Sequence, residues 1–300
     1  MKIIVSTSIA GLLRAVSLDE ALETVARAGY TQVDFPLSVF SRPAGSPLKG
    51  EGWQGWTREL RRKLDALGLQ VVQAHASWEQ AIGEDLAFQE PFSVYERTIA
   101  ACSILGCPNL VFHAPLYFFP MGDGAARRRV TDWNIRWFSR LVPHLEEAGV
   151  TAALENTFDY RRVQRPGDPP FTYTSAEDML ELVEGIGSQR VGICLDTGHA
   201  NIAGQNPAGM IRAYGDRLKV LHLNDNFGLI GPVYEDLHLF PGHGNLNWGE
   251  IFRALRETGF TGSFNLEPVG ALPGLSPAVR VLQLRSAREV VTRMAREAGY

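Results

Sequence analysis

Short apolar or β-branched runs alternate with longer stretches of helical period along the whole chain, and this alternation restricts the fold more than any other feature. The runs predicted as strands are Lys2–Ser8, Gln32–Leu37, Gln70–Ala76, Asn109–Pro115, Thr151–Thr157, Val191–His199, Leu218–Asp225 and Gly262–Pro268. The helices predicted around them are Leu18–Ala28, Thr57–Leu67, Ser93–Leu105, Arg127–Ala148, Ala176–Gly185, Trp248–Thr258 and Ala278–Ala298. Several helices run into a glycine, as in Ala28-Gly29, and glycine suits the left-handed position that ends a helix. The chain therefore reads as a series of strand–helix units.

Eight such units within 300 residues match a closed parallel barrel. An open doubly wound sheet is the alternative, but no Gly-x-Gly-x-x-Gly follows any predicted strand, so the usual dinucleotide-binding signature of that fold is missing. No low-complexity linker divides the chain. We therefore predict the α/β class, with a single (β/α)8 TIM barrel domain over residues 1–300.

Composition excludes several classes of protein. There are 29 Lys plus Arg against 33 Asp plus Glu, and the resulting net charge of −4 lacks the positive excess of a dedicated nucleic-acid binder. The three cysteines show neither metal-finger spacing nor an even count for disulfides. The apolar start of the chain is too short for a signal peptide, and no window is long enough to cross a membrane. We expect a cytoplasmic protein.

Polar residues with metal-binding chemistry stand near the ends of seven predicted strands. They are Asp34, His75, His113, Glu155, Asp196, His222 and Glu267, at intervals of 41, 38, 42, 41, 26 and 45 residues. Most intervals equal one strand–helix unit, so these side chains should meet at the rim where barrel enzymes build their active sites. Burying such groups is costly unless they are paired or bind a metal.

Four consecutive units each supply one ligand, namely Glu155, Asp196, His222 and Glu267, and this set predicts a shared divalent metal. Mixed carboxylate and imidazole ligands do not choose among manganese, magnesium, cobalt and zinc. Asp34 could equally well support a metal ligand or contact the substrate. Cys194 is interpreted as a residue that packs in the hydrophobic core.

The loops that follow the strands carry aromatic and basic residues. Trp78, Tyr117 and Phe227 are of the kind that stacks on sugars, although packing is the commoner use of such rings. Arg161 follows the strand that ends in Glu155 and could meet a phosphate or carboxylate, or serve only solubility. Arg127 and its two neighbours are interpreted as a solvated helix face.

Several short motifs together resemble one family. Leu154-Glu155-Asn156-Thr157, Leu195-Asp196-Thr197-Gly198-His199, His222-Leu223-Asn224-Asp225, and Asp236-x-His238 followed by Pro241-Gly242-x-Gly244-Asn245 look like the xylose-isomerase-like barrel superfamily. That superfamily includes sugar isomerases and epimerases, inosose dehydratases and endonuclease IV. The resemblance implies an eight-stranded barrel with one divalent metal on Glu155, Asp196, His222 and Glu267.

In the sugar branch of this family, the resemblance implies that Glu155 and Glu267 also transfer protons through a metal-stabilised enediolate. His199 would then hold a substrate oxygen. Ketose 3-epimerases place an arginine shortly after the residue equivalent to His222, whereas this chain reads Asn224-Asp225-Asn226-Phe227-Gly228. The resemblance therefore assigns neither the substrate nor the choice among isomerase, epimerase and dehydratase.

The endonuclease IV branch uses up to three zinc ions, and this chain has a residue for all nine ligands. They are His75, His113, Glu155, Asp196, His199, His222, Asp236, His238 and Glu267. The largely neutral, aromatic rim loops favour a carbohydrate over DNA. We expect a metal-dependent sugar isomerase or epimerase, with a zinc phosphodiesterase on abasic DNA or a keto-sugar dehydratase as alternatives. The expected partner is a small carbohydrate rather than nucleic acid or membrane, and the sequence leaves the oligomeric state open.

Overall fold

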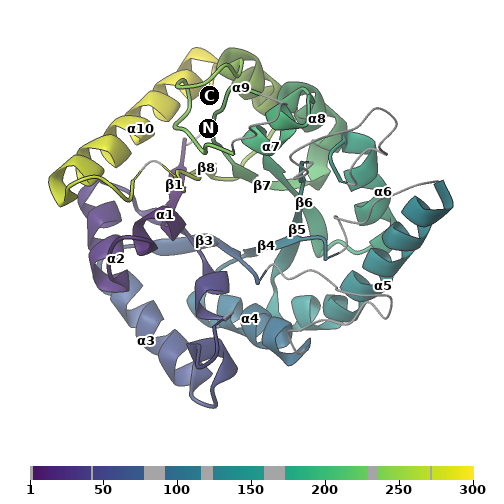
Figure 1. The fold of residues 1–300 in the computed structure, drawn as a ribbon, viewed down its shortest axis with the longest axis horizontal. Coiled ribbons are helices and arrows are strands. Elements are labelled where there is room, and N and C mark those ends of the chain that lie inside the picture. The colour runs from purple at the N-terminus through teal and green to yellow at the C-terminus, as the bar shows by residue number, and fades with distance from the viewer. Residues whose placement is uncertain are drawn as a thin grey trace.

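The computed structural model describes residues 3–41, 43–77, 92–115, 124–158, 173–228, 236–270 and 272–300, and contains eight parallel strands ringed by helices (Figure 1). The strands are β1 (Val5–Ser8), β2 (Gln32–Phe35), β3 (Gln70–His75), β4 (Asn109–His113), β5 (Thr151–Glu155), β6 (Val191–Asp196), β7 (Leu218–His222) and β8 (Phe264–Leu266). Each strand from β1 to β6 pairs with the next one along the chain, and β8 pairs with β1. A parallel bridge between Leu223 and Leu266 joins the remaining two edges. The predicted (β/α)8 barrel is confirmed.

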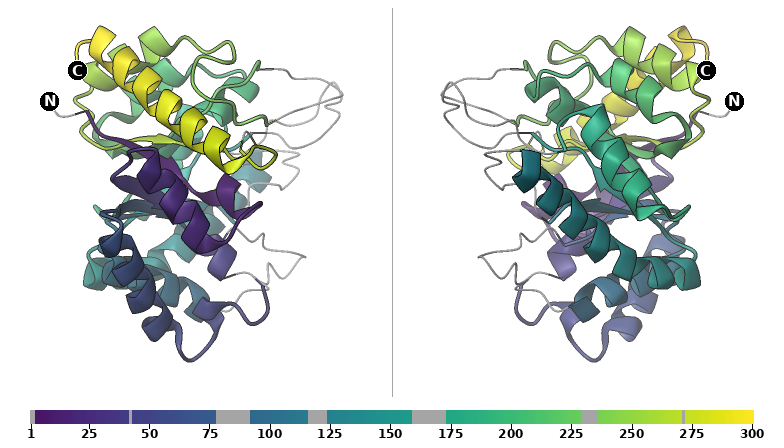
Figure 2. Two further views of the ribbon diagram at one scale, coloured as in Figure 1. Left: turned by 90° about the vertical axis from the view of Figure 1, so that its left-hand side faces the viewer. Right: turned by 90° about the vertical axis from the view of Figure 1, so that its right-hand side faces the viewer.

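Helices cover the outside of this ring, as both side views show (Figure 2). They are α1 (Ala10–Leu13), α2 (Leu18–Arg27), α3 (Trp53–Ala66), α4 (Phe92–Leu105), α5 (Gly124–Ala148), α6 (Ala176–Ile186), α7 (Thr197–Ile202), α8 (Pro207–Tyr214), α9 (Trp248–Glu257) and α10 (Pro277–Glu297). Polar caps start several of them: the Ser17 hydroxyl accepts from Glu20 N, and the Ser175 hydroxyl accepts from Asp178 N. The glycines predicted to end helices have positive φ, from 67° at Gly68 to 87° at Gly29.

Alternate residues of each strand face the helices or the barrel interior. On β5, Ala152 and Leu154 pack into the large core shared with the helices. Ala153 instead belongs to a small separate cluster inside the barrel, which we call the apolar interior set: Val111, Ala153, Cys194 and Val220. The remaining strands place buried polar side chains inside the barrel, which we call the polar interior set: Ser6, Asp34, Gln73 and Asn265.

The strand and helix boundaries differ from the prediction most clearly after β6. The predicted strand Val191–His199 stops at Asp196, because the Asp196 side chain accepts a hydrogen bond of 2.7 Å from His199 N and so caps α7. His199 therefore lies in a helix rather than at a strand end. The prediction also missed α1 and α8, although Asn206 before Pro207 is a recognisable helix start.

Both ends of the chain lie at the same end of the barrel (Figure 2). Across the residues that the structure describes, no helix combines the length and the apolar character that crossing a bilayer requires.

Candidate metal centre and active site

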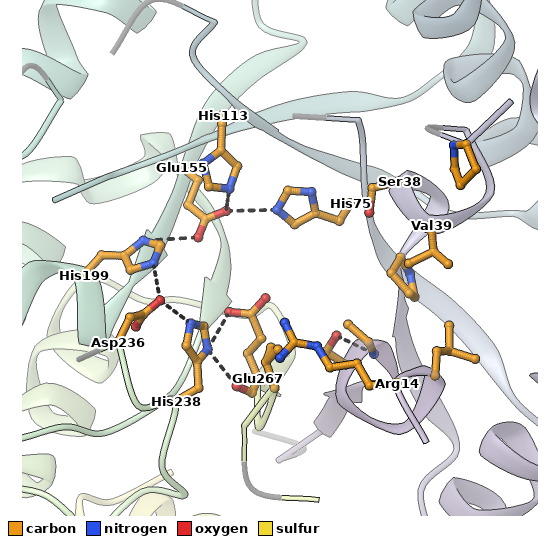
Figure 3. A pocket seen from close by; sticks show the side chains of 16 residues that line it. Arg14, Ser38, Val39, His75, His113, Glu155, His199, Asp236, His238 and Glu267 are labelled. Atoms are coloured by element: carbon orange, nitrogen blue, oxygen red, sulfur yellow. Dashed lines mark hydrogen bonds and ion pairs between the residues drawn. The ribbon is translucent and has the colours of Figure 1, made fainter. Parts of the chain in front are cut away.

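A cavity of about 800 Å³ opens at the carboxyl ends of the strands, and the metal-type side chains predicted from the sequence gather around it (Figure 3). Its described lining includes the following residues of that kind: His75, His113, Glu155, His199, Asp236, His238 and Glu267. Asp196 and His222 are fully buried and have ligand atoms within 4.8 Å of those of Glu155 and Glu267. The position agrees with the active-site end of this fold.

Four donors form a compact central group. One ligand atom from each of Glu155, Asp196, His222 and Glu267 can be chosen so that all four lie within 4.8 Å of one another. The Nδ1 atom of His222 lies 3.1 Å from Glu155 Oε1 and 3.4 Å from Glu267 Oε2. Three buried carboxylates around one imidazole repel one another, and Glu267 Oε2 is buried with no hydrogen-bond partner among the described residues. This donor set fits a divalent cation.

A second group lies beside the first and shares Glu155 with it. His75 Nε2 and His113 Nε2 lie 3.2 Å and 3.1 Å from Glu155 Oε2, respectively. The centroids of the two imidazole rings are 5.1 Å apart. Glu155 thus uses Oε1 toward His222 and Oε2 toward this pair, so its carboxylate bridges both groups.

A third group joins Asp196 to the helix and loop residues. Asp196, His199 and His238 also bring ligand atoms within 4.8 Å of one another. Asp236 Oδ2 lies 2.8 Å from His238 Nε2 and 3.6 Å from His199 Nε2. His238 has a φ of 45°, which a residue with a side chain rarely adopts, so this loop holds the imidazole in place at a cost in backbone strain.

Burial and neighbouring charges shift the pKa values of the two glutamates beside His222 in opposite directions. Burial raises the pKa of Glu267 to about 7, against the opposing effect of His222 and His238. Burial acts in the same direction on Glu155, but His222 and His113 outweigh it and hold the pKa of that carboxyl well below its usual range. Burial opposes the protonation of His238, yet Asp236 raises its pKa to about 9.

The structure also places residues in the cavity that the sequence argument passed over. Ser8 ends β1, Ser38 follows β2, and Arg14 follows α1; all three line the cavity. Figure 3 shows Ser38 beside His75, and Arg14 on the side of the cavity away from His199. Ser8 could have been found as the strand-end residue of β1, whereas α1 is too short to leave a periodic signal that would place Arg14.

The substrate contacts predicted from the loop residues are not found in the described lining of the cavity. Trp78, Tyr117 and Arg161 lie outside the described residues. Phe227 is about half exposed and is not part of the cavity lining. Arg127 is partly exposed and forms ion pairs with the largely buried Asp178 and the exposed Glu181, so its guanidinium is held against α6 rather than being freely solvated.

Known proteins with related sequences include sugar enzymes and a nuclease. A D-psicose 3-epimerase of Enterocloster bolteae is 40% identical over 160 residues, which cover 53% of this chain and 46% of that protein. A probable endonuclease 4 of Methanoculleus marisnigri is 32% identical over 237 residues, or 72% of this chain and 76% of that protein. The match spans less than half of the epimerase, and also only 43% of an uncharacterised Methanocaldococcus jannaschii relative.

A solved structure titled as an IOLI protein with a zinc atom superimposes with a TM-score of 0.76 over 97% of this chain and 99% of that one. Its 17% identity speaks for the fold alone. The family model described as "Xylose isomerase-like TIM barrel" matches residues 22–284. This chain belongs to the xylose isomerase-like TIM barrel family.

Proposed function

We propose that this chain is a divalent-metal-dependent isomerase or epimerase of a keto- or aldo-sugar, or of a sugar derivative, and that Glu155 and Glu267 are its proton-transfer pair. The observation that carries the proposal is the position of these two glutamates on the same imidazole nitrogen of His222, with pKa values displaced in opposite directions. A pair of carboxyl groups whose environments separate their pKa values can act as base and acid.

The residues divide the work as follows. Glu155, Asp196, His222 and Glu267 would hold the metal, which would polarise the carbonyl and hydroxyl oxygens of the substrate. Glu155, ionised at neutral pH, takes the proton from the carbon beside the carbonyl. Glu267, whose carboxylate lies 3.4 Å from the same imidazole nitrogen, delivers a proton to the same or the neighbouring carbon.

The cavity suits a small polar substrate. Its volume of about 800 Å³ lies within the range of roughly 300–1,000 Å³ that is usual for small-molecule sites. His199 would hold a substrate oxygen beside the metal. Ser8, Ser38 and Arg14 would serve hydroxyl or anionic groups at the far end of the substrate.

The decisive experiment follows deuterium exchange in D2O over a panel of ketoses and aldoses. We expect wild type to introduce deuterium at the carbon beside the carbonyl, and Glu155→Gln and Glu267→Gln to slow this by about 10²–10⁴-fold, because each loses its base or acid while keeping an oxygen ligand. Exchange at the wild-type rate in both metal-loaded variants would refute the two-glutamate mechanism. A mass decrease by one water would instead identify a dehydratase, which expels a β-hydroxyl from the same carbanionic state.

Metal content is tested separately from activity. We expect His222→Ala to lower bound divalent metal strongly, because it removes one of four ligands, while His243→Ala, which changes an imidazole outside the cavity lining, should leave it unchanged. Undiminished metal in His222→Ala would count against the central group as a metal site.

One observation favours a second candidate, a zinc-dependent phosphodiesterase acting on abasic DNA. Every one of the nine side chains named for that activity takes part in the three adjoining donor groups, and Glu155 and Asp196 each belong to two of those groups. This candidate requires up to three zinc ions and nicking of an abasic duplex. The sugar enzyme requires one tightly bound metal and no nicking, so zinc stoichiometry and a gel assay separate the two candidates.

A further inference from the structure

The imidazole of His222 has one nitrogen in the central donor group and one outside it. Its Nδ1 atom faces Glu155, Glu267 and Asp196. Its Nε2 atom points to the opposite side and is buried without a hydrogen-bond partner among the described residues. Asp34 Oδ2 lies 3.6 Å from Nε2, and Asp34 Oδ1 is likewise buried and unpartnered there. The Nε2 atom of His222 thus lies beside the Asp34 carboxylate, which has hydrogen-bonding capacity left inside the barrel.

The carboxylate of Asp34 is held in this place by side chains from two other strands. Asn265 Nδ2, on β8, donates to Asp34 Oδ2 at 3.2 Å, and Gln73 Nε2, on β3, lies 3.4 Å from the same oxygen. Asn265 Oδ1 in turn accepts a hydrogen bond of 2.9 Å from Ser6 on β1. These contacts use Oδ2, and among the described residues none donates a hydrogen bond to Oδ1, so the carboxylate can accept one more hydrogen.

Asp34 does not reach the substrate cavity. Its side chain is 1% exposed, and Asp34 is absent from the cavity lining, which includes its neighbours Pro36 and Ser38. A role for this carboxylate therefore has to act through another residue, and His222 is the ring that it faces.

We propose that Asp34 is a positioning residue that accepts the Nε2–H hydrogen of His222 and so fixes the ring with the Nδ1 lone pair aimed at the metal. This inference rests on the proposed metal centre. Histidines that bind metals commonly donate their other ring N–H to a carboxylate, which sets the tautomer and strengthens the ligand. Moving the ring by about 0.6 Å brings Nε2 and Asp34 within ordinary hydrogen-bond distance.

The test compares Asp34→Asn with a matched buried carboxylate at the same end of the barrel. Asp225 accepts from Gly242 N at 2.9 Å and from Trp248 Nε1 at 2.8 Å, and it belongs to none of the three donor groups. Zinc affinity, measured by competition with a chelator, should fall about 10–100-fold in Asp34→Asn. Asp225→Asn should lower stability and leave zinc affinity within threefold of wild type.

A second readout follows the ring itself. In zinc-loaded protein with 15N-labelled histidine, His222 Nε2–H should give a downfield, slowly exchanging resonance, assigned by its absence in His222→Gln. We expect Asp34→Asn to shift it upfield and speed its exchange with water, whereas Asp225→Asn should not. Unchanged zinc affinity together with an unchanged resonance in Asp34→Asn would overturn the proposal.

Two further results keep the outcomes distinct. If Asp34→Asn does not fold, Asp34→Thr takes its place, since it is neutral, fits the space and can still accept from Asn265; the same two criteria then decide. If His222→Ala binds zinc as wild type does, the proposed metal centre itself fails. If His222→Ala loses zinc and the Asp34 variant keeps it, only the role of Asp34 fails.

Discussion

The two halves of the barrel interior are built differently beneath the same rim of metal-type donors. Strands β4 to β7 place the apolar interior set two residues before four donors: Val111 before His113, Ala153 before Glu155, Cys194 before Asp196, and Val220 before His222. Strands β8 and β3 place polar residues there instead, with Asn265 before Glu267 and Gln73 before His75, and neighbouring β1 and β2 add Ser6 and Asp34.

The difference shows what each half contributes. The apolar interior set is packed like ordinary core and supports its donors by exclusion of water. In the polar interior set, Ser6 donates to Asn265, and Asn265 and Gln73 each donate to Asp34. This network holds the Asp34 carboxylate 3.6 Å from His222 Nε2. Barrel interiors are usually filled by Val, Ile and Leu, so a buried polar half marks a place where orientation matters more than stability.

The largest expected effect comes from exchanging the character of the two halves. Val111→Asn buries an amide among Ala153, Cys194 and Val220 with no partner on those neighbouring side chains, and we expect a loss of about 3–5 kcal/mol in the free energy of unfolding. Asn265→Val removes one of two donors to Asp34 and should cost about 1–3 kcal/mol. Urea unfolding of both variants measures the difference; equal losses would mean that the two halves do not differ in kind.

The next largest effect is the pH dependence of metal affinity, which should differ between Glu267, after β8 in the polar half, and Glu155, at the end of β5 in the apolar half. Metal binding requires an ionised Glu267, whose pKa of about 7 means that protons compete below that pH. We therefore expect affinity for Mn²⁺ to fall about tenfold for each pH unit below 7 on account of this group. Glu155, with its lowered pKa, should contribute no such dependence above pH 5.

Electron paramagnetic resonance of free Mn²⁺ between pH 5.5 and 8 measures this dependence. In Glu267→Gln the slope of log affinity against pH should decrease by one proton per metal, while any contribution from His222 remains in both proteins. An unchanged slope in this variant would show that Glu267 does not carry the competing proton.

The fold and most of the donor set follow from the sequence because both depend on local patterns. Glu155 and His222 each end a short apolar run that is almost entirely buried, and such a run is visible in the sequence whatever the details of packing. His199 was assigned to a strand because its place depends on one hydrogen bond from its backbone to Asp196. The role of Asp34 depends on three strands meeting inside the barrel, and a single chain carries no local signal for such a contact.

A smaller effect is expected from Gln73→Leu in the polar interior set. The side chain of Gln73 lies 3.4 Å from both Asp34 Oδ2 and the carbonyl oxygen of Leu221, which are long contacts, so losing them should cost only about 1–2 kcal/mol. Zinc affinity should fall less than in Asp34→Asn, because Asn265 still holds the carboxylate. Calorimetric zinc titration and urea unfolding check both values, and a loss of affinity equal to that of Asp34→Asn would show that Gln73 alone sets the carboxylate.

The smallest effect should come from Cys194→Ala, which tests whether the apolar half is only packing. The Cys194 side chain lies close enough to Glu155 and His222 to form a donor group with them, so a thiolate ligand is geometrically available. Burial, however, raises the pKa of this thiol far above neutrality, and the uncharged form packs with Val111, Ala153 and Val220. We expect the variant to bind zinc within threefold of wild type and to lose about 1 kcal/mol or less in stability, since alanine removes only one buried atom.

Cobalt(II) absorption gives a direct check, because a thiolate ligand adds an intense charge-transfer band in the near ultraviolet that carboxylate and imidazole ligands do not produce. A band of this kind in wild type that disappears in Cys194→Ala would place Cys194 among the ligands and make the apolar half part of the metal centre.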